Sequence, residues 1–298
     1  MLRFSRNLLR RVRDTLTRPL AHELSAQTHE LSAQTWVQRS QHDFLMREEW
    51  VRSANATENP LNRFGAKYFS QTDEDGITLE IVKRLGMKDG IFAELGVGNG
   101  LENNTLILLA SGWRGFWIGG QDLAFDHTLN PQRFLFLKDW VSLDNILSLF
   151  KKGLGNFGTT ELDLLSLDLD GNDYYFVQEL LKASIRPKIF ILEYNAKFPP
   201  PIKWIISYNS IHRWDGTDYF GASLAAFCEL LAQFSYTLLC CNAATGANAF
   251  FVTNECAACF PEVPKRIEDI FVDCRYQLPL NWGLRSSPKT IERMLQTG

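Results

Sequence analysis

Glu94, Gly96, Gly98 and Gly100 alternate with other residues directly after a short apolar run and before a helical one. Glycine lets a backbone turn sharply and approach a ligand, and the free N–H groups that open a helix favour an anionic group. The pattern therefore predicts a cofactor-binding turn that receives a carboxylate or phosphate. It is not the dinucleotide fingerprint GxGxxG, because the sixth position counted from Gly96 is Leu101. A glycine turn without a ligand is the alternative interpretation.

Two pairs of polar residues follow later apolar runs. Asp168 and Asp170 share one face of a strand because side chains alternate with a period of two, and Glu193 and Asn195 do the same after the next run. Carboxylates this close raise one another's pKa or hold a hard cation. If the two strands are parallel neighbours, their oxygen atoms suit Mg²⁺ or Ca²⁺. A solvated, aspartate-rich turn is the alternative for the first pair.

Residues 196–221 form a long aromatic-rich connection between a strand and a helix. Its length exceeds what a simple chain reversal needs, so we expect it to cover a substrate site, with aromatic faces suited to stacking on a sugar. His212 in this segment is a candidate general base because its ordinary pKa lies near neutrality; a surface or capping histidine is the alternative. Asp218 is a candidate cap for a helix over 221–231.

The elements that must position these residues alternate between short apolar runs and helical spacing. Helices are predicted from 72 to 86, 143 to 150 and 174 to 181. Strands are predicted at 91–93, 115–118, 133–137, 162–167, 188–192, 236–240 and 249–253. Such alternation favours a parallel sheet covered by helices on both faces, whose ligands bind at the carboxyl ends of the strands. The last two strands are close enough to form a hairpin.

The first 58 residues differ from the rest. Residues 1–20 carry six arginines against one acid with apolar residues on one helical face, which suits an anionic membrane surface, a docking helix or a transit peptide. Residues 22–28 and 29–35 repeat HELSAQT, and this heptad places one seam on a helix. The polar stretch 53–60 is predicted to be a linker. No apolar run approaches the length of a membrane span.

Composition limits the class of protein. The 298 residues are 45% hydrophobic, so the chain can bury a large core of one domain with an extension. A net charge of −3 gives no support for a nucleic-acid groove. The six cysteines contain one CxxC pair, which favours free thiols over a zinc site, and without a secretory signal peptide we expect a cytoplasmic protein. The expected organisation is a helical extension over 1–58, a main domain over 59–260 and a helix and loop tail over 261–298.

Five segments together resemble the FkbM-like branch of class I S-adenosylmethionine (SAM) methyltransferases. They are YFSQTDEDG, FAELGVGNG, LLSLDLDGNDYY, ILEYNAKFPP and WDGTDYFGASL, and the resemblance covers about Tyr68 to Val252. The resemblance implies an α/β, Rossmann-like fold with a seven-stranded, mostly parallel sheet and a C-terminal antiparallel hairpin. It also implies SAM as the cofactor and O-methylation of a small-molecule or glycan hydroxyl.

The resemblance assigns expected roles to the cofactor-binding residues. Glu94 would orient the methionine amino end, and the turn that contains Gly96, Gly98 and Asn99 would form the backbone cradle. Members of the family present an acid to the ribose after the second strand, where this chain has Gly119 and Gly120. The residues expected at the ribose and adenine are Asp122, Asp139 and Trp140.

Catalysis is expected to involve Asp168, Glu193 and His212. A Mg²⁺ ion held by Asp168, Asp170, Glu193 and Asn195 would be similar to the metal of catechol-type O-methyltransferases. Residues 1–58 are expected to contact a membrane surface or a partner helix. Two other functions remain open: a non-catalytic Rossmann-like adaptor, and a metal-dependent hydroxylase on the same fold.

Overall fold

The computed structural model describes residues 2–275 and 286–297, except for the side chains of residues 2–26 and 29. The chain divides into two compact units, Met1–Glu48 and Glu49–Gly298. The second unit contains the sheet and all the candidate site residues, and we describe each unit by itself.

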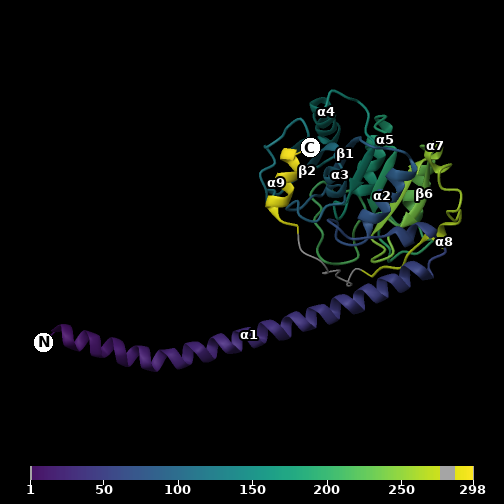
Figure 1. Ribbon diagram of the computed structural model, residues 1–298. Helices are drawn as coiled ribbons and strands as arrows, with labels where there is room; N and C mark the ends of the chain where they lie inside the picture. Colours follow the sequence, from purple (N-terminus) through teal and green to yellow (C-terminus); the bar gives the residue numbers. More distant parts are fainter. Residues whose placement is uncertain (1, 276–285, 298) are drawn as a thin grey trace. The chain divides into compact units, whose positions relative to one another are not determined.

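The sheet of the second unit has seven strands in the order β3-β2-β1-β4-β5-β7-β6. In Figure 1, the labels β2 and β1 lie toward one side of the sheet and β6 toward the other. Strands β1 to β5 pair in parallel, and β7 is antiparallel to both of its neighbours. The bounds are β1 Ile91–Leu95, β2 Arg114–Gly119, β3 Phe134–Lys138, β4 Leu164–Leu167, β5 Ile189–Glu193, β6 Tyr236–Cys241 and β7 Asn248–Thr253. This arrangement confirms the predicted fold class, including the C-terminal hairpin.

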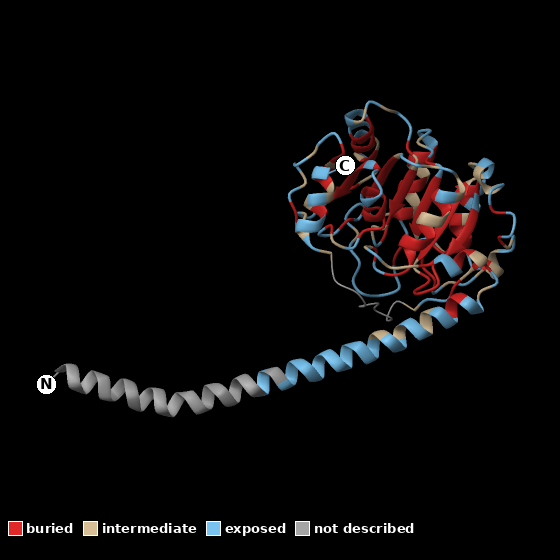
Figure 2. Cartoon of the chain, viewed as in Figure 1, coloured by how far each residue is buried: buried red, intermediate tan, exposed pale blue. Residues whose placement is uncertain are grey.

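The strands are continuous apolar runs because both faces of the sheet are covered. All five residues of β1 are buried, and Figure 2 shows burial throughout the sheet. Phe92, Trp117, Phe190 and Phe250 are fully enclosed. Burial on this scale makes the strand ends rigid supports for the polar residues that follow them.

The helices follow the predicted alternation. They are η1 Pro60–Phe64, α2 Glu74–Arg84, α3 Leu106–Ala110, α4 Ile146–Asn156, α5 Asp173–Lys182, α6 Leu224–Ala232, α7 Asn254–Ala257, α8 Ile267–Ile270 and α9 Pro288–Thr297. Helix α4 contacts β2, β3 and α5, whereas α3 contacts α2 and α9. The predicted cap of α6 is wrong: the Ser223 side chain accepts the Ala226 N–H, whereas Asp218 pairs with Lys197.

The prediction of a linker over 53–60 is also wrong. Helix α1 continues to Ala56, and Asn59 caps η1. The amide of Asn59 donates to Leu239 O at 2.6 Å, and that of Asn62 donates to Cys241 O at 2.6 Å. These asparagines are buried donors for β6 carbonyls, so this polar stretch is part of the second unit.

Helix α1 (Leu2–Ala56) forms the whole first unit and enters the second. Several large apolar side chains of residues 31–45 are solvent-exposed, among them Trp36, Phe44 and Leu45. The side chains of the basic segment 1–20 and of most of the first heptad copy lie outside the described residues. Within the described part of the chain, no helix is long and apolar enough to cross a membrane.

The C-terminal segment packs on the core of the second unit. Phe260, Ile270 and Val272 are buried, and the Tyr194 hydroxyl donates to Val272 O at 2.9 Å. Helix α9 buries Ile291 and Leu295. The expected tail is therefore part of the same compact unit as the sheet.

Candidate active site at the carboxyl ends of the strands

Two cavities meet at the carboxyl ends of the central strands. The first measures about 190 Å³ and the second about 140 Å³. Both are lined by Gly96, Val97, Gly98 and Asp168, so they lie on either side of the glycine turn. This is the edge at which a doubly wound sheet binds ligands.

Gly96 brings the β1 turn into contact with the end of β4. Its φ is +84°, and a Cβ atom at this position would lie 1.5 Å from the Asp168 carbonyl oxygen. A side chain cannot fit in that distance, so glycine is required here for packing. Gly98 has a φ of +51° and has open space beside its Cα, which lets its backbone face the cavities.

Glu94 binds the start of α3 with both carboxylate oxygens. Its Oε1 accepts from Asn104 N at 3.0 Å, and its Oε2 accepts from Thr105 N at 2.9 Å and Thr105 Oγ1 at 2.5 Å. Burial raises the pKa of this carboxyl. The N–H groups of Asn104 and Thr105, which open α3, therefore donate to Glu94. The prediction that the N–H groups at the start of this helix bind an anionic group of a ligand is wrong.

The ends of β2 and β3 form one wall of the first cavity. Asp139 and Trp140 line it as predicted. A Cβ atom on Gly120 would lie 2.7 Å from Trp140 Cε3, so the indole ring covers the position where a side chain would stand. A side chain at position 120 would therefore require the Trp140 ring to move.

Asp122 does not line either cavity. Its side chain is 84% exposed and its carboxylate pairs with Lys138 Nζ at 2.6 Å. Gln121 lines the first cavity instead. Sequence reasoning missed Gln121 because it searched for an acid, although a glutamine next to the glycines also offers hydrogen bonds to hydroxyls.

Asn99 lines the second cavity, and its side chain also stabilises the turn. Its Oδ1 accepts from Leu101 N at 3.1 Å, and its carbonyl accepts from Ala124 N at 2.8 Å. The expected cradle residues Glu94, Gly96, Gly98 and Asn99 therefore all come together around this cavity.

Asp168, Asp170 and Glu193 form the carboxyl-end acid cluster. Ligand atoms of these three residues lie within 4.8 Å of one another. Asp173 holds the turn that carries the first two, since its carboxylate accepts from Leu169 N at 2.8 Å and Gly171 N at 2.9 Å. Asp170 has a φ of 55°, a left-handed conformation that is uncommon for a side-chain-bearing residue and that this turn maintains.

The carboxyls of this cluster are held toward their protonated forms. Burial and the neighbouring charges of Asp170 and Asp173 raise the pKa of Asp168 to about 8. Burial and the charge of Asp168 raise the pKa of Glu193 well above its usual range. The Asp168 and Glu193 carboxyls hydrogen-bond to each other, so the pair shares a proton as one unit.

Two polar atoms beside the cluster are buried without a hydrogen-bond partner among the described residues. They are Glu193 Oε2 and His212 Nε2. His212 lines the first cavity and packs against Gly171, where a Cβ atom would lie 2.3 Å from its ring. Buried polar atoms are normally satisfied, so both are available to a bound group.

Asn195 is separated from the cluster by its own bonds. Its amide donates to Asp218 O at 2.8 Å and Phe220 O at 3.0 Å, and its Oδ1 accepts from Lys197 N at 3.2 Å. The Asn195 side chain therefore anchors segment 196–221. Its oxygen already accepts a hydrogen bond from Lys197 N, so these contacts do not support its predicted role as a metal ligand.

Segment 196–221 is fastened next to the first cavity. Asn172 and Asn209 exchange hydrogen bonds, and Gly221 N donates to Gly171 O at 3.1 Å. The Arg213 guanidinium lies over the Trp140 ring at 5.0 Å from its centroid. These contacts hold the connection beside the first cavity, and its role as the cover of a substrate site stays a prediction.

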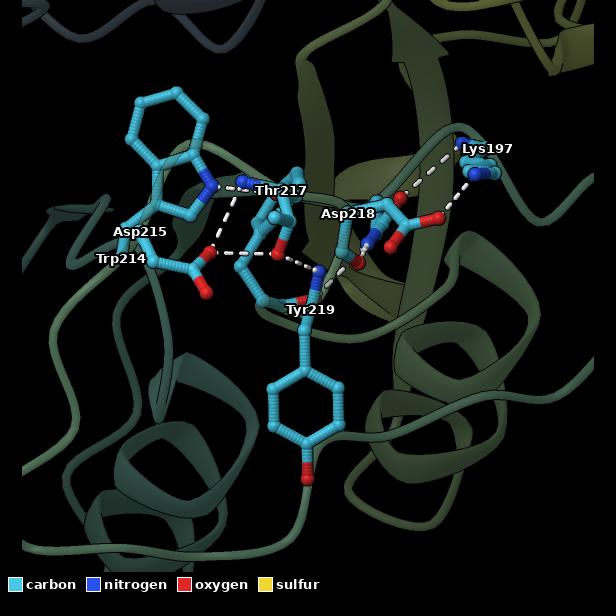
Figure 3. Close-up of polar contacts among 8 residues, drawn as sticks. Lys197, Trp214, Asp215, Thr217, Asp218 and Tyr219 are labelled. Carbon is cyan, nitrogen blue, oxygen red and sulfur yellow. Dashed lines mark hydrogen bonds and ion pairs between the residues drawn. The ribbon is translucent and has the colours of Figure 1, made fainter.

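The outer part of the segment presents two aromatic rings on a folded turn (Figure 3). Trp214 Nε1 donates to Thr217 O at 2.6 Å, and Thr217 Oγ1 donates to Asp215 Oδ1 at 2.6 Å. Trp214 and Tyr219 remain 52% and 50% exposed. The turn therefore holds aromatic surface in solvent without burying it.

No protein-family model matches this chain, and no curated protein matches it. One similar solved structure is the 1,6-didemethyltoxoflavin-N1-methyltransferase of Burkholderia thailandensis with S-adenosylhomocysteine. Its identity is 14% and its TM-score 0.36, over 75% of this chain and 88% of that one.

Two further solved structures are similar at lower coverage. The small RNA methyltransferase HEN1 has 11% identity and a TM-score of 0.31, over 59% of this chain and 24% of that one. An O-methyltransferase family 2 protein of Planctomyces limnophilus DSM 3776, in complex with apigenin, has 11% identity and a TM-score of 0.32, over 71% of this chain and 61% of that one. The chain thus spans less than two thirds of either protein, and no inference about activity follows from these scores.

Proposed function

We propose that this protein is a SAM-dependent methyltransferase that methylates a hydroxyl group of a small molecule or glycan. The observation that carries the proposal is the position of the Asp168–Glu193 pair directly beside cavities that a glycine turn lines. A cofactor cradle and a proton acceptor at one sheet edge are the two parts that such a reaction needs.

The walls of the first cavity fit an adenosine group. Trp140, Val141 and Phe176 supply apolar surface, and Gln121 and Asp139 supply polar groups. Ligand pockets of this kind combine apolar walls with a few polar atoms that fix orientation. Gln121 and Asp139 are the residues we assign to the ribose and base in place of Asp122.

SAM, when bound, would supply a methyl group carried on a sulfonium. The role of the chain is to hold the acceptor hydroxyl in line with that methyl group and to accept the hydroxyl proton. Glu193 Oε2 and His212 Nε2 are buried at the site and have no hydrogen-bond partner in the described part of the chain. We assign the proton to the Asp168–Glu193 pair, because burial and their neighbouring charges raise the pKa of both carboxyls, which makes an ionised carboxylate of the pair a stronger base than a solvated one.

The same cluster fits a divalent cation. Asp168, Asp170 and Glu193 offer carboxylate oxygens at suitable mutual distances, and hard cations prefer such ligands. A Mg²⁺ ion there would lower the pKa of a bound hydroxyl. The carboxylate-only set suits Mg²⁺ or Ca²⁺ better than iron, which disfavours the hydroxylase.

The acceptor would approach past segment 196–221. Exposed indole and phenol rings, as at Trp214 and Tyr219, stack on the apolar faces of sugars or aromatic rings. This supports a glycan or ring-bearing hydroxyl compound as the acceptor. The six cysteines are unpaired, which accords with a reducing compartment, and we propose the cytoplasm.

The exposed apolar side chains of α1 favour one alternative, an adaptor that acts through this helix at a membrane surface or a partner helix. Deletion of residues 1–48 tests it, because residues from Glu49 onward belong to the second unit. The adaptor hypothesis is supported if this deletion abolishes function in cells while Glu94→Ala and Asp168→Ala do not.

Isothermal titration with SAM, with and without Mg²⁺, tests the proposed function. We expect a single site per chain, and we expect Asp122→Asn to bind as the wild type does, because Asp122 is exposed and outside both cavities. Absence of binding at millimolar SAM under both conditions would contradict the proposal.

A further inference from the structure

Helix α1 carries a group of large exposed apolar side chains within residues 36–45, which we call the α1 patch. Trp36, Phe44 and Leu45 are 70%, 64% and 61% exposed. Val37 beside them is 48% exposed. Figure 2 shows this part of α1 as exposed. Single exposed apolar residues are common on soluble proteins, whereas several of them on so short a stretch of one helix mark a contact surface.

The sequence around the α1 patch is not that of a helix that is stable alone. Residues 32–42 read SAQTWVQRSQH, in which serine, threonine, tryptophan, valine and histidine have lower helix propensity than alanine or leucine. Among the described residues, the ion pairs within α1 are Arg52–Glu49 and His42–Asp43. Isolated helices depend on propensity and on such pairs, and otherwise on packing of an apolar face. The stability of α1 therefore requires a partner packed on this patch.

The α1 patch has the shape that receives a side chain from a facing helix. Six residues line one depression on it: Trp36, Val37, Ser40, Gln41, Phe44 and Leu45. The middle four, from Val37 to Phe44, have the spacing i, i+3, i+4 and i+7. Residues at this spacing are neighbours on a helix surface, and four such neighbours form the hole for one side chain of a second helix. The depression is therefore a hole for helix packing.

The same surface also carries side chains that can fill such a hole. Trp36, Ser40 and Phe44 follow one another at intervals of four, so a small residue stands between two large rings on one ridge of α1. A ring of a second, identical helix can pack over Ser40 while the serine of that helix receives a ring in return. Gln41 can pair with its counterpart in the second copy, because an amide both donates and accepts. The α1 patch is thus complementary to itself.

Period and charge favour a helix over a lipid surface as the partner. The heptad repeat of residues 22–35 and the interval of seven between Val37 and Phe44 keep the period of helices that wind around each other. Helices that lie on a membrane have a polar face rich in lysine and arginine. Residues 27–48 instead contain three acids and two bases: Glu30, Asp43, Glu48, Arg39 and Arg47.

We propose that this protein forms a homodimer through α1, in which the α1 patch of one chain packs against the α1 patch of the other. A two-fold contact requires a surface that is complementary to itself, and the alternation of large and small residues along α1 provides it. Each chain brings its own second unit, so the dimer has two candidate active sites. The inference concerns residues outside both cavities and does not rest on the proposed function.

Sedimentation velocity on the full chain, between about 1 and 100 µM, tests the dimer because this range detects micromolar dissociation constants. We expect the wild type to have the mass of two chains at the upper end. Far-UV circular dichroism should show a loss of helix on dilution, because α1 then loses its packing. A wild type that remains a single chain at about 100 µM would overturn the proposal, and the α1 patch would then belong to a different partner.

Variants place the contact on the α1 patch. Phe44→Glu introduces a charge into the buried contact and should weaken the dimer by about 100-fold or more. Thr35→Glu is the matched control: it adds the same charge at an exposed position two residues before Val37, on the opposite side of the helix. This control should leave the dissociation constant within about 3-fold of the wild type. Equal weakening by the two variants would contradict the proposed contact.

Ser40→Phe distinguishes specific packing from general apolar association. The substitution makes the α1 patch more apolar, but it fills the space that receives a ring from the second copy. Because overpacking a close contact is destabilising, the dimer should weaken by about 10-fold or more. A dimer that becomes tighter would show that no ring packs over Ser40, and it would overturn the proposed packing.

Discussion

Two groups of acids in this molecule look alike by charge and differ in their partners. The carboxyl-end acid cluster contains Asp168, Asp170 and Glu193, and the α2 acid cluster contains Asp73, Glu74 and Asp75. Burial raises the pKa of Asp168 to about 8, and it raises the pKa values of Asp73 and Asp75 to about 6. Burial and a shifted pKa therefore do not by themselves distinguish a site from a structural group.

Hydrogen bonding distinguishes them. Asp75 Oδ2 accepts from Tyr68 N, Phe69 N and Ser70 N at 2.6 to 2.9 Å. Asp73 accepts from Ala243 N at 3.0 Å and Ala244 N at 3.1 Å.

The α2 acid cluster thus ties loops to the sheet. Asp75 Oδ1 is unpartnered, but the residue lines neither cavity. In the carboxyl-end acid cluster, by contrast, Asp168 and Asp170 line the first cavity, and the buried Glu193 Oε2 near them has no hydrogen-bond partner among the described residues. Acids that the backbone satisfies hold the fold, and acids left open beside a cavity are the candidates for chemistry.

The largest expected effect is on catalysis. Glu193→Gln and Asp168→Asn should each lower methyl transfer by about 10²- to 10⁴-fold, the range for loss of a general base. Transfer of labelled methyl groups to a panel of glycan and phenolic hydroxyl acceptors measures it, with Asp122→Asn as the exposed control. Full activity in both Glu193→Gln and Asp168→Asn would show that the carboxyl-end acid cluster is no more catalytic than the α2 acid cluster.

Stability should respond to the α2 acid cluster. Asp75→Ala leaves three backbone N–H groups without their acceptor and should lower the free energy of unfolding by about 3 kcal/mol, since each unsatisfied buried group costs about 1–3 kcal/mol and water reaches part of this loop. Urea denaturation measures the change. Asp168→Asn, which replaces a carboxyl that is held toward its protonated form by a neutral amide, should cost clearly less; the reverse order would contradict the comparison.

A divalent cation should stabilise the protein by binding to the carboxyl-end acid cluster. At about 100 times its dissociation constant, Mg²⁺ or Ca²⁺ should add about 2.7 kcal/mol to the free energy of unfolding. Thermal unfolding with and without chelator detects this, and Glu193→Gln should abolish the gain while Asp122→Asn keeps it. A gain that survives Glu193→Gln would place the ion elsewhere.

The smallest expected effect is a pH dependence from Asp75. Its pKa of about 6 lies above the ordinary aspartate value near 3.9, so between these values the folded state binds a proton that the unfolded state has lost. Stability should therefore fall as pH rises from about 4 to 6, by at most about 1.4 kcal/mol per pH unit for one proton. Asp75→Asn should flatten this part of a urea-midpoint profile; an unchanged profile assigns the proton to another group.

The order of elements could be predicted from sequence because apolar runs and glycine turns are local signals. All seven strands lie where the runs of β-forming residues predict them. The cavity lining by Gly96, Gly98 and Trp140 also follows from strand ends alone. Local pattern was sufficient wherever a residue stands directly after a buried strand.

Residues whose role depends on distant partners could not be predicted in this way. Asp122 has the right chemistry, but Lys138 holds it in solvent. The free oxygen of Asn248 depends on Glu74, which lies 174 positions away in the chain. Asn195 was expected at a metal, yet its bonds with residues 197–220 turn it into a loop anchor. Which atom of an amide or carboxylate remains free is set by tertiary contacts that no local pattern contains.

A crystal structure with S-adenosylhomocysteine and Mg²⁺ tests the central claim most directly. We predict adenosine between Gln121 and Trp140 and the ion on Asp168 and Glu193. Ligand density at a different edge of the sheet, or an S-adenosylhomocysteine-soaked crystal with both cavities filled only by water, would contradict the account.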